Sequence, residues 1–275
     1  MGIPFAAREP DDGLGNVLTS FPSARSLRAA GGYRPDLPLT VLLAETPYDD
    51  QRFWGLLAGV ARRFRPRDVA VVFEEEDAFT TARWRDVAAA LGPHAESLSV
   101  VAYYGEHIAR DPLLPDLRAF RRLKSLAVHH LAYLEDRGGP GRAGIAGVMD
   151  EAQLGRLERL EFSGIAPGVL ERAVGPPLPA LRALVLHDAD PVHARSIVAL
   201  ASRCPRLATL VCSVSEDDSD PEAVAPCLIR VARALPLAQL AVECDPSMRG
   251  CVPRVAALRD PHTLPEYDRV FRCAA

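Results

Sequence analysis

Leu123-Lys124-Ser125-Leu126-Ala127-Val128 has the frame L-x-x-L-x-(apolar), and the same frame returns along the chain at intervals of 24 to 34 residues. Eight copies align: Leu39-Leu42-Ala44, Asp68-Val71-Phe73, Leu98-Val101-Tyr103, Leu123-Leu126-Val128, Leu157-Leu160-Phe162, Leu181-Leu184-Leu186, Leu207-Leu210-Cys212 and Leu237-Leu240-Val242. Apolar residues at alternate positions are typical of a strand that is buried on one face. Repetition at this period predicts a stack of repeats that share one core.

The segments between the frames are predicted to be helices. One helical face, with i, i+3, i+4, i+7 spacing, is formed by Phe53, Leu56, Leu57, Val60, Ala61 and Phe64. The same spacing recurs over 224–235 and, more loosely, over 194–201. Strand and helix in alternation predict an α/β fold, namely a leucine-rich-repeat solenoid or horseshoe. Its parallel sheet would lie on the concave side and its helices on the convex side.

One repeat contains a further signature. Leu200-Ala201-Ser202-Arg203-Cys204-Pro205-Arg206-Leu207 is an L-A-x-x-C-x-x-L turn. With this turn and the L-x-x-L-x-L frames, residues 20–245 resemble the leucine-rich repeats of the cysteine-containing type in F-box proteins. The resemblance implies a substrate receptor of a cullin-type ubiquitin ligase, which an F-box would join to the ligase adaptor. Residues 1–36 hold no recognisable F-box, so a receptor-like paralogue without the box is the other form of this expectation.

The domain organisation follows from the repeats. We expect residues 1–36 to form an N-terminal cap or a degenerate first repeat, 37–245 the leucine-rich repeats, and 246–275 a C-terminal cap. A single solenoid accounts for all 275 residues, because neighbouring repeats share a continuous core.

The composition excludes several classes of protein. With 48% apolar and 25% charged residues, the chain has globular values and is not intrinsically disordered. Its net charge of −4 gives no reason to expect a nucleic-acid partner. Lys124 is the single lysine among 32 basic residues, which we interpret as coding bias toward arginine.

The sequence also predicts a compartment. No apolar run approaches the roughly 18 residues that span a bilayer, so no membrane contact is expected. Residues 1–12 lack the basic and apolar regions of a signal peptide. The six cysteines form no C-x-x-C pair, which favours free thiols in a reducing compartment. We therefore expect a cytoplasmic or nuclear protein.

The predicted binding residues come from the seventh position of each frame. Side chains alternate along a strand, so this position is expected on the concave surface when the leucines point into the core. The row consists of Glu45, Glu74, Tyr104, His129, Ser163, His187, Ser213 and Glu243. Its acidic start, its Tyr and His middle and its apolar flanks suit a basic, partly apolar segment of a protein partner. A solvated sheet face without a partner is the alternative.

The same row does not predict catalysis, a metal site or a cofactor. His129 and His187 occupy equivalent positions two repeats apart, about 10 Å, which is too far for a shared zinc ion. Ser163 lies between them, and no acid is expected to orient either imidazole. We therefore expect a protein-binding module that is not an enzyme.

A glycine-rich loop supports the alternative function. Gly139-Pro140-Gly141-Arg142-Ala143-Gly144 spells G-x-G-x-x-G, the loop of nucleotide-binding proteins and α/β enzymes. Such a loop must follow a strand directly. The nearest predicted strand ends near His129, some ten residues earlier, which favours an inserted loop on a repeat.

Overall fold

We describe the fold from a computed structural model of the chain. The structure describes residues 16–19, 37–43, 51–73, 81–102, 116–134, 149–165, 177–186, 198–199, 201–214 and 239–244. Among them, nine strands form one sheet. They are β1 (Asn16–Thr19), β2 (Leu39–Leu43), β3 (Asp68–Phe73), β4 (Ser97–Ala102), β5 (Ser125–Leu134), β6 (Arg159–Ile165), β7 (Ala183–Leu186), β8 (Thr209–Val214) and β9 (Gln239–Cys244).

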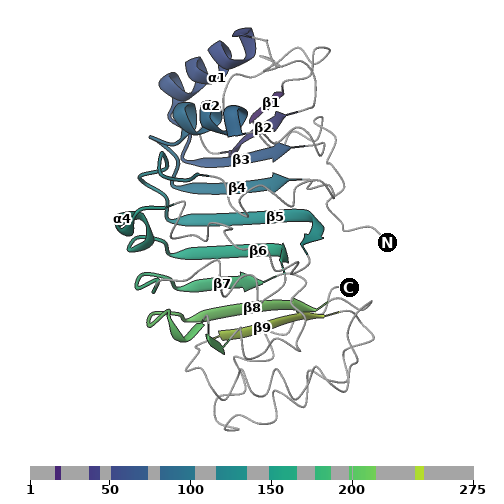
Figure 1. Ribbon diagram of the computed structural model, residues 1–275, viewed down its shortest axis with the longest axis vertical. Helices are drawn as coiled ribbons and strands as arrows, with labels where there is room; N and C mark the ends of the chain where they lie inside the picture. The colour runs from purple at the N-terminus through teal and green to yellow at the C-terminus, as the bar shows by residue number, and fades with distance from the viewer. Residues whose placement is uncertain are drawn as a thin grey trace.

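Every strand pairs in parallel with the next strand of the chain, so the order in the sheet is β1 to β9 (Figure 1). Parallel neighbours need a connection that returns to the same end of the sheet. The expected α/β class with a parallel sheet is confirmed. β1 lies within the predicted N-terminal part, whereas residues 246–275 lie outside the described residues.

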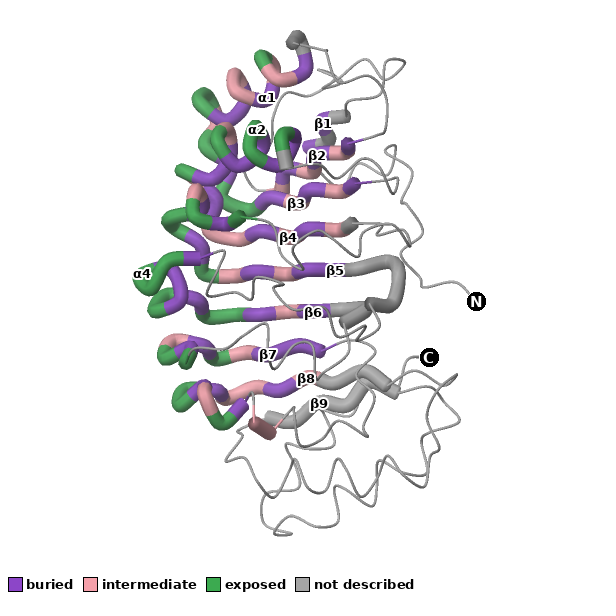
Figure 2. Tube along the Cα trace, in the orientation of Figure 1, coloured by how far each residue is buried: buried purple, intermediate pink, exposed green. Residues whose placement is uncertain are grey.

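One face of the sheet forms the core. Its alternate side chains stack in register from strand to strand, and each is at most 1% exposed: Leu39, Val69, Leu98, Leu126, Leu160, Leu184 and Leu210. A second buried row runs beside the first from Val41 to Leu186. Figure 2 shows the alternation of buried and half-buried residues along the first strands. The rows account for the leucine frames, because each repeat buries its apolar side chains against the next.

Two helices cover this face near the first strands, α1 (Gln51–Phe64) and α2 (Thr81–Leu91). The spacing over 53–64 predicted α1, and its buried residues Phe53, Leu57, Val60 and Ala61 belong to the same core as the strands. α1 ends where Arg65 adopts a φ of 49° and Pro66 follows, since proline cannot continue the helix.

Tight turns precede several of the later strands. An apolar residue recurs at every third position, and each N–H bonds to the carbonyl three residues earlier, as in Leu123 N to Phe120 O at 3.1 Å. The predicted L-A-x-x-C-x-x-L turn has this form, with Ala201, Cys204 and Leu207 buried. Cys204 is buried and forms no disulfide in the described part of the chain, and burial raises the pKa of its thiol to about 11. The helix expected over 224–235 lies outside the described residues.

The register corrects three of the eight frames. From Leu123 onward the predicted frames agree with the observed pairing, but Leu98 pairs with Leu126 and is therefore the second residue of its frame, not the first. β2 is displaced by the same three residues, whereas β3 is displaced by two, because Val71 aligns with Val100 and Val128. A shift of three exchanges the two faces of β2 and β4, which have apolar residues on both faces, so their alternation is weak.

β5 is longer than expected. It was predicted to end near His129, but it continues to Leu134 after a register irregularity between those residues. The glycine-rich segment 139–144 therefore begins five residues after the end of β5, and it lies outside the described residues.

Gly92 occupies a close approach between two repeats. A Cβ at this position would lie 2.5 Å from the Ala88 carbonyl oxygen and 2.7 Å from that of Ala119. We expect Gly92→Ala to lower the free energy of unfolding by about 1–3 kcal/mol, because backbone atoms must shift. A Cβ at Gly59 would have no other atom within 4 Å. Gly59→Ala should therefore stabilise α1 by about 0.5–1 kcal/mol. Urea unfolding followed by circular dichroism measures both, and equal effects would contradict the close approach.

No helix in the described part of the chain is long and apolar enough to cross a membrane.

Candidate functional site

The strand side chains that point away from α1 and α2 form a second surface of the sheet, which we call the opposite face. The pairing of the strands arranges its positions in rows. The row that contains His129 passes through Thr19, Leu42, Val72, Val101, His129 and Ser163, and the pair Ser213 and Glu243 continues it on β8 and β9. Structural repeats thus place equivalent residues side by side, about 4.8 Å apart.

The register aligns part of the predicted row, because His129 pairs with Ser163 and Ser213 pairs with Glu243. On β2, β3 and β4, the residues that align with His129 in the strand pairing are Leu42, Val72 and Val101. Glu45, Glu74 and Tyr104, which were predicted there, come two or three residues later in the chain and lie outside the described residues, as does His187. The acidic start of the row is therefore replaced by an apolar one.

Leu42, Val72 and Val101 form what we call the apolar strip. All three side chains are half-buried, and each belongs to a different strand. The neighbouring row of the same face has small residues there, namely Thr40, Ala70 and Ser99. The strip is thus a half-buried apolar stripe across three neighbouring strands, flanked by small residues.

A polar cluster follows the apolar strip, made of His129 on β5 and Arg159 and Glu161 on β6. Arg159 Nη2 donates a hydrogen bond to Glu161 Oε2 at 2.7 Å, and His129 Nε2 lies 3.8 Å from Glu161 Oε1. The side chains of His129 and Glu161 are 10% and 16% exposed, whereas that of Arg159 is 48% exposed. The carboxylate is thus held between a guanidinium and an imidazole, with the guanidinium turned toward solvent.

The surroundings of the cluster strengthen its interactions. Val185 on β7 pairs with Glu161 in the register and is 3% exposed. Charges interact more strongly where water is displaced, so the Arg159–Glu161 pair is stronger here than on an open surface.

The cluster also corrects one expectation. No acid was expected beside His129 and Ser163, yet Glu161 lies next to His129 and two residues before Ser163 on the same strand. The sequence signal was present, because Glu161 is the one charged residue among the apolar inner neighbours of the row. Its pairing with Arg159 makes it a charge-positioning group, and an ordered surface for binding is what the three residues can provide.

The structure describes no cation site in this region: within the described ranges, no group of three or more His, Cys, Asp and Glu side chains is arranged to hold a metal ion.

We found no match to the chain among protein-family models, curated proteins or solved structures.

Proposed function

We propose that the chain is a leucine-rich-repeat horseshoe that binds a protein partner on its opposite face and performs no catalysis. The observation that carries this proposal is the continuous surface formed by the apolar strip and the polar cluster. Such a surface offers area for apolar side chains and a fixed polar group at one end, which is the usual anatomy of a protein-binding patch.

The repeat architecture is supported by three features that agree with one another. The strands follow one another in chain order, the frames recur every 24 to 34 residues, and the tight turns bury an apolar residue at every third position. A stack of this kind produces an extended binding surface, because equivalent positions of successive repeats line up.

The chemistry of the strip narrows the kind of partner. With Leu42, Val72 and Val101 at the start of the row, apolar side chains of the partner would be buried there. Arg159 would then donate to a carboxylate or carbonyl of the partner, because its guanidinium is half-exposed and already oriented by Glu161. The basic segment expected from Glu45 and Glu74 has no support from this register.

The biological role that we propose is substrate recognition for a cullin-type ubiquitin ligase, by a receptor or by a paralogue without an F-box. It rests on the resemblance of residues 200–207 and of the frames to the repeats of F-box proteins. With this role we expect the protein in the cytoplasm or nucleus.

The test changes the apolar strip and compares the proteins captured from cells. In Val72→Lys/Val101→Lys, two charges replace apolar side chains at half-buried strand positions, so we expect capture of the partner to fall at least tenfold, about 1.4 kcal/mol. Affinity purification with mass spectrometry measures the loss. The matched control is Ala82→Lys/Ala89→Lys, which adds the same charges at exposed positions of α2.

The outcomes separate the parts of the proposal. Loss of a partner from the strip variant, with capture by the control unchanged, supports binding at the opposite face. Equal capture by both variants contradicts it. Absence of a cullin and its adaptor from all samples contradicts the ligase role, and saturable binding of NAD or NADP in calorimetry would favour the alternative function at 139–144.

A further inference from the structure

The turns that lead into strands β3 to β8 lie together along one edge of the molecule. Together with the last residues of α1 and the short helix at Glu151–Leu154, they comprise residues 62–67, 92–96, 116–124, 150–158, 177–182 and 201–208, and we call this the turn edge. In parallel neighbours the same ends of the strands meet, so these turns are stacked in the order of the repeats (Figure 1). The turn edge is distinct from the opposite face, which is formed by the strands themselves.

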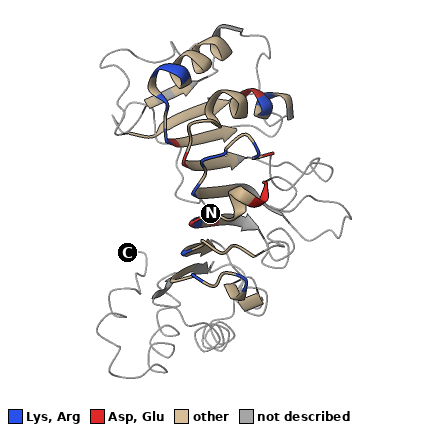
Figure 3. Ribbon diagram, turned by 90° about the vertical axis from the view of Figure 1, so that its left-hand side faces the viewer, with Lys and Arg blue, Asp and Glu red and all other residues tan. Residues whose placement is uncertain are grey.

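The turn edge has a charge opposite to that of the chain. Its segments contain twelve Arg and Lys residues against five Asp and Glu, which leaves +7, whereas the whole chain has a net charge of −4. Residues elsewhere must therefore sum to −11. In the ribbon of Figure 3, Lys and Arg positions, coloured blue, recur along the side that faces the viewer.

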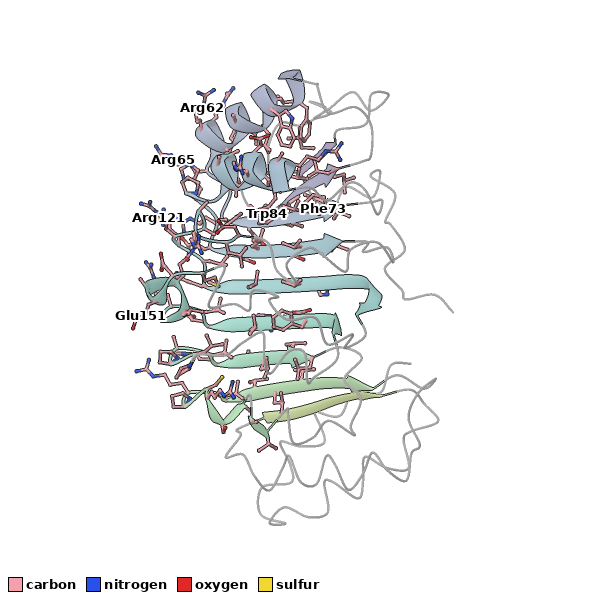
Figure 4. All side chains as sticks on the ribbon, viewed as in Figure 1. Arg62, Arg65, Phe73, Trp84, Arg121 and Glu151 are labelled. Carbon is pink, nitrogen blue, oxygen red and sulfur yellow. The ribbon has the colours of Figure 1, made fainter. Side chains whose placement is uncertain are left out.

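The basic side chains of this edge are presented to solvent. Eleven of the twelve are exposed, and Arg203 is half-buried. Two groups of four dominate: Arg62, Arg63, Arg65 and Arg67 before β3, and Arg118, Arg121, Arg122 and Lys124 before β5. Figure 4 shows Arg62, Arg65 and Arg121 projecting outward on the same side.

Glu96 lies between the two groups and contacts one cation of each. The carbonyl of the residue before each strand accepts two N–H groups from the next repeat, as at Arg67, whose oxygen lies 2.7 Å from Glu96 N and 2.9 Å from Ser97 N. Arg67, Glu96 and Lys124 therefore occupy equivalent positions. Glu96 lies 3.7 Å from Arg67 Nε and accepts from Lys124 Nζ at 2.9 Å, a hydrogen bond that lowers its pKa.

Most of the positive charge is left unneutralised. Within the described residues, the ion pairs of this edge involve Arg67, Arg118 and Lys124. Arg62, Arg65, Arg121 and Arg122 form none there. Since the two groups stand two strands apart, roughly 10 Å separates equivalent positions, which an extended chain of about three residues spans.

We propose that the turn edge binds an acidic segment of a partner protein, with several carboxylates in succession. Arginine pairs with carboxylates through two parallel hydrogen bonds, and two groups of cations at fixed spacing would engage successive acidic residues. A protein segment fits better than a nucleic acid, because the −11 carried elsewhere would repel a long polyanion. A short acidic segment can remain within about 8 Å of the edge, the distance over which charges act at physiological salt.

The experiment measures binding of fluorescein-labelled octaglutamate to the full chain by fluorescence polarisation. We expect saturable binding that weakens between about 50 and 200 mM salt. Arg121→Gln/Arg122→Gln should weaken it about fivefold, since two exposed cations are lost. Arg121→Lys/Arg122→Lys is the matched control and should stay within about twofold, while Glu158→Gln, which removes an exposed acid of the edge, should tighten binding.

Three results would overturn the proposal. The first is no saturable binding of octaglutamate by a chain whose circular dichroism shows it folded. The second is equal affinity of the glutamine variant and the wild type. The third is binding of a thymidine 20-mer, or of vesicles containing phosphatidylserine, that is tighter than that of octaglutamate and as dependent on salt. This result would indicate that the turn edge binds a nucleic acid or a membrane instead.

Discussion

Gln153→Glu is expected to lower the free energy of unfolding by about 3 kcal/mol or more, because it places a carboxylate where a fully buried amide donates two hydrogen bonds. Gln153 lies in the short helix α4 (Glu151–Leu154) and is fully buried. Its Nε2 donates to the carbonyls of Leu117 and Phe120 in the preceding repeat, at 2.8 and 3.0 Å. A carboxylate oxygen in place of that nitrogen would face two carbonyl oxygens without a proton to share.

The other half of the side chain supports the same expectation. Gln153 Oε1 accepts from Asp150 N at 2.7 Å, and Gln153 N donates to the Asp150 carboxylate at 2.8 Å, a capping box that starts α4. The side-chain amide therefore accepts one hydrogen bond within its own repeat and donates two to the preceding repeat.

Urea unfolding of the wild type, Gln153→Glu and Gln153→Met measures this role. Met keeps much of the volume but loses all three side-chain hydrogen bonds, so a smaller loss of about 1–3 kcal/mol is expected. Burial would raise the pKa of the introduced carboxyl above its unfolded value, so the penalty of Gln153→Glu should shrink as pH falls from 7 toward about 4, where both states become protonated. A Glu variant as stable as the Met variant at pH 7 would contradict the assigned contacts.

The predicted strands differ in accuracy for a reason that can be read from their residues. β5 and β6 carry Ser125, Ala127, Arg159 and Glu161 between buried positions, so the small, polar and charged residues fix which side chains face the core. β2 and β4 have Leu42 and Val101 on the opposite face beside apolar core residues, and hydrophobicity alone cannot distinguish the two faces there. The predicted frames were therefore correct in the strands where polar residues show which alternate side chains face away from the core.

The site residues divide in the same way. His129 was predicted on the binding row and lies there, next to Ser163. The contribution of Glu161 was missed because its contact with His129 joins residues 32 positions apart, which depends on strand pairing and not on local spacing. The turn edge was missed for the related reason that its cations are distributed over separate repeats and gather only when the strands stack.

The capping box of α4 could have been found without a structure. Asp150 followed three residues later by Gln153 is a helix-start signature, and the buried contacts of the amide are what the sequence does not contain. Local patterns thus predict where elements begin, whereas the bonds that join one repeat to the next come from the stacking.

Trp84→Ala is expected to cost about 3–5 kcal/mol of unfolding free energy, because it empties a large buried site between two repeats. Trp84 on α2 is 2% exposed and stacks on Phe120 with ring centroids 5.7 Å apart. The ring of Phe73 lies 6.4 Å from that of Trp84 (Figure 4). Its indole Nε1 donates to the Asp116 carbonyl at 2.6 Å. The residue thus ties α2 to the turn before β5.

Trp84→Phe separates the packing from the hydrogen bond. Phenylalanine retains the ring contacts but leaves the Asp116 carbonyl without its indole donor, so a loss of about 1–2 kcal/mol is expected. Trp54 is then the single tryptophan, and its fluorescence reports unfolding near α1 while circular dichroism reports the whole chain. Because each strand of the sheet packs against its neighbours, coincident transitions are expected in the wild type and an earlier fluorescence transition in Trp84→Ala. Coincident, unshifted transitions in Trp84→Ala would show that α2 does not link these repeats.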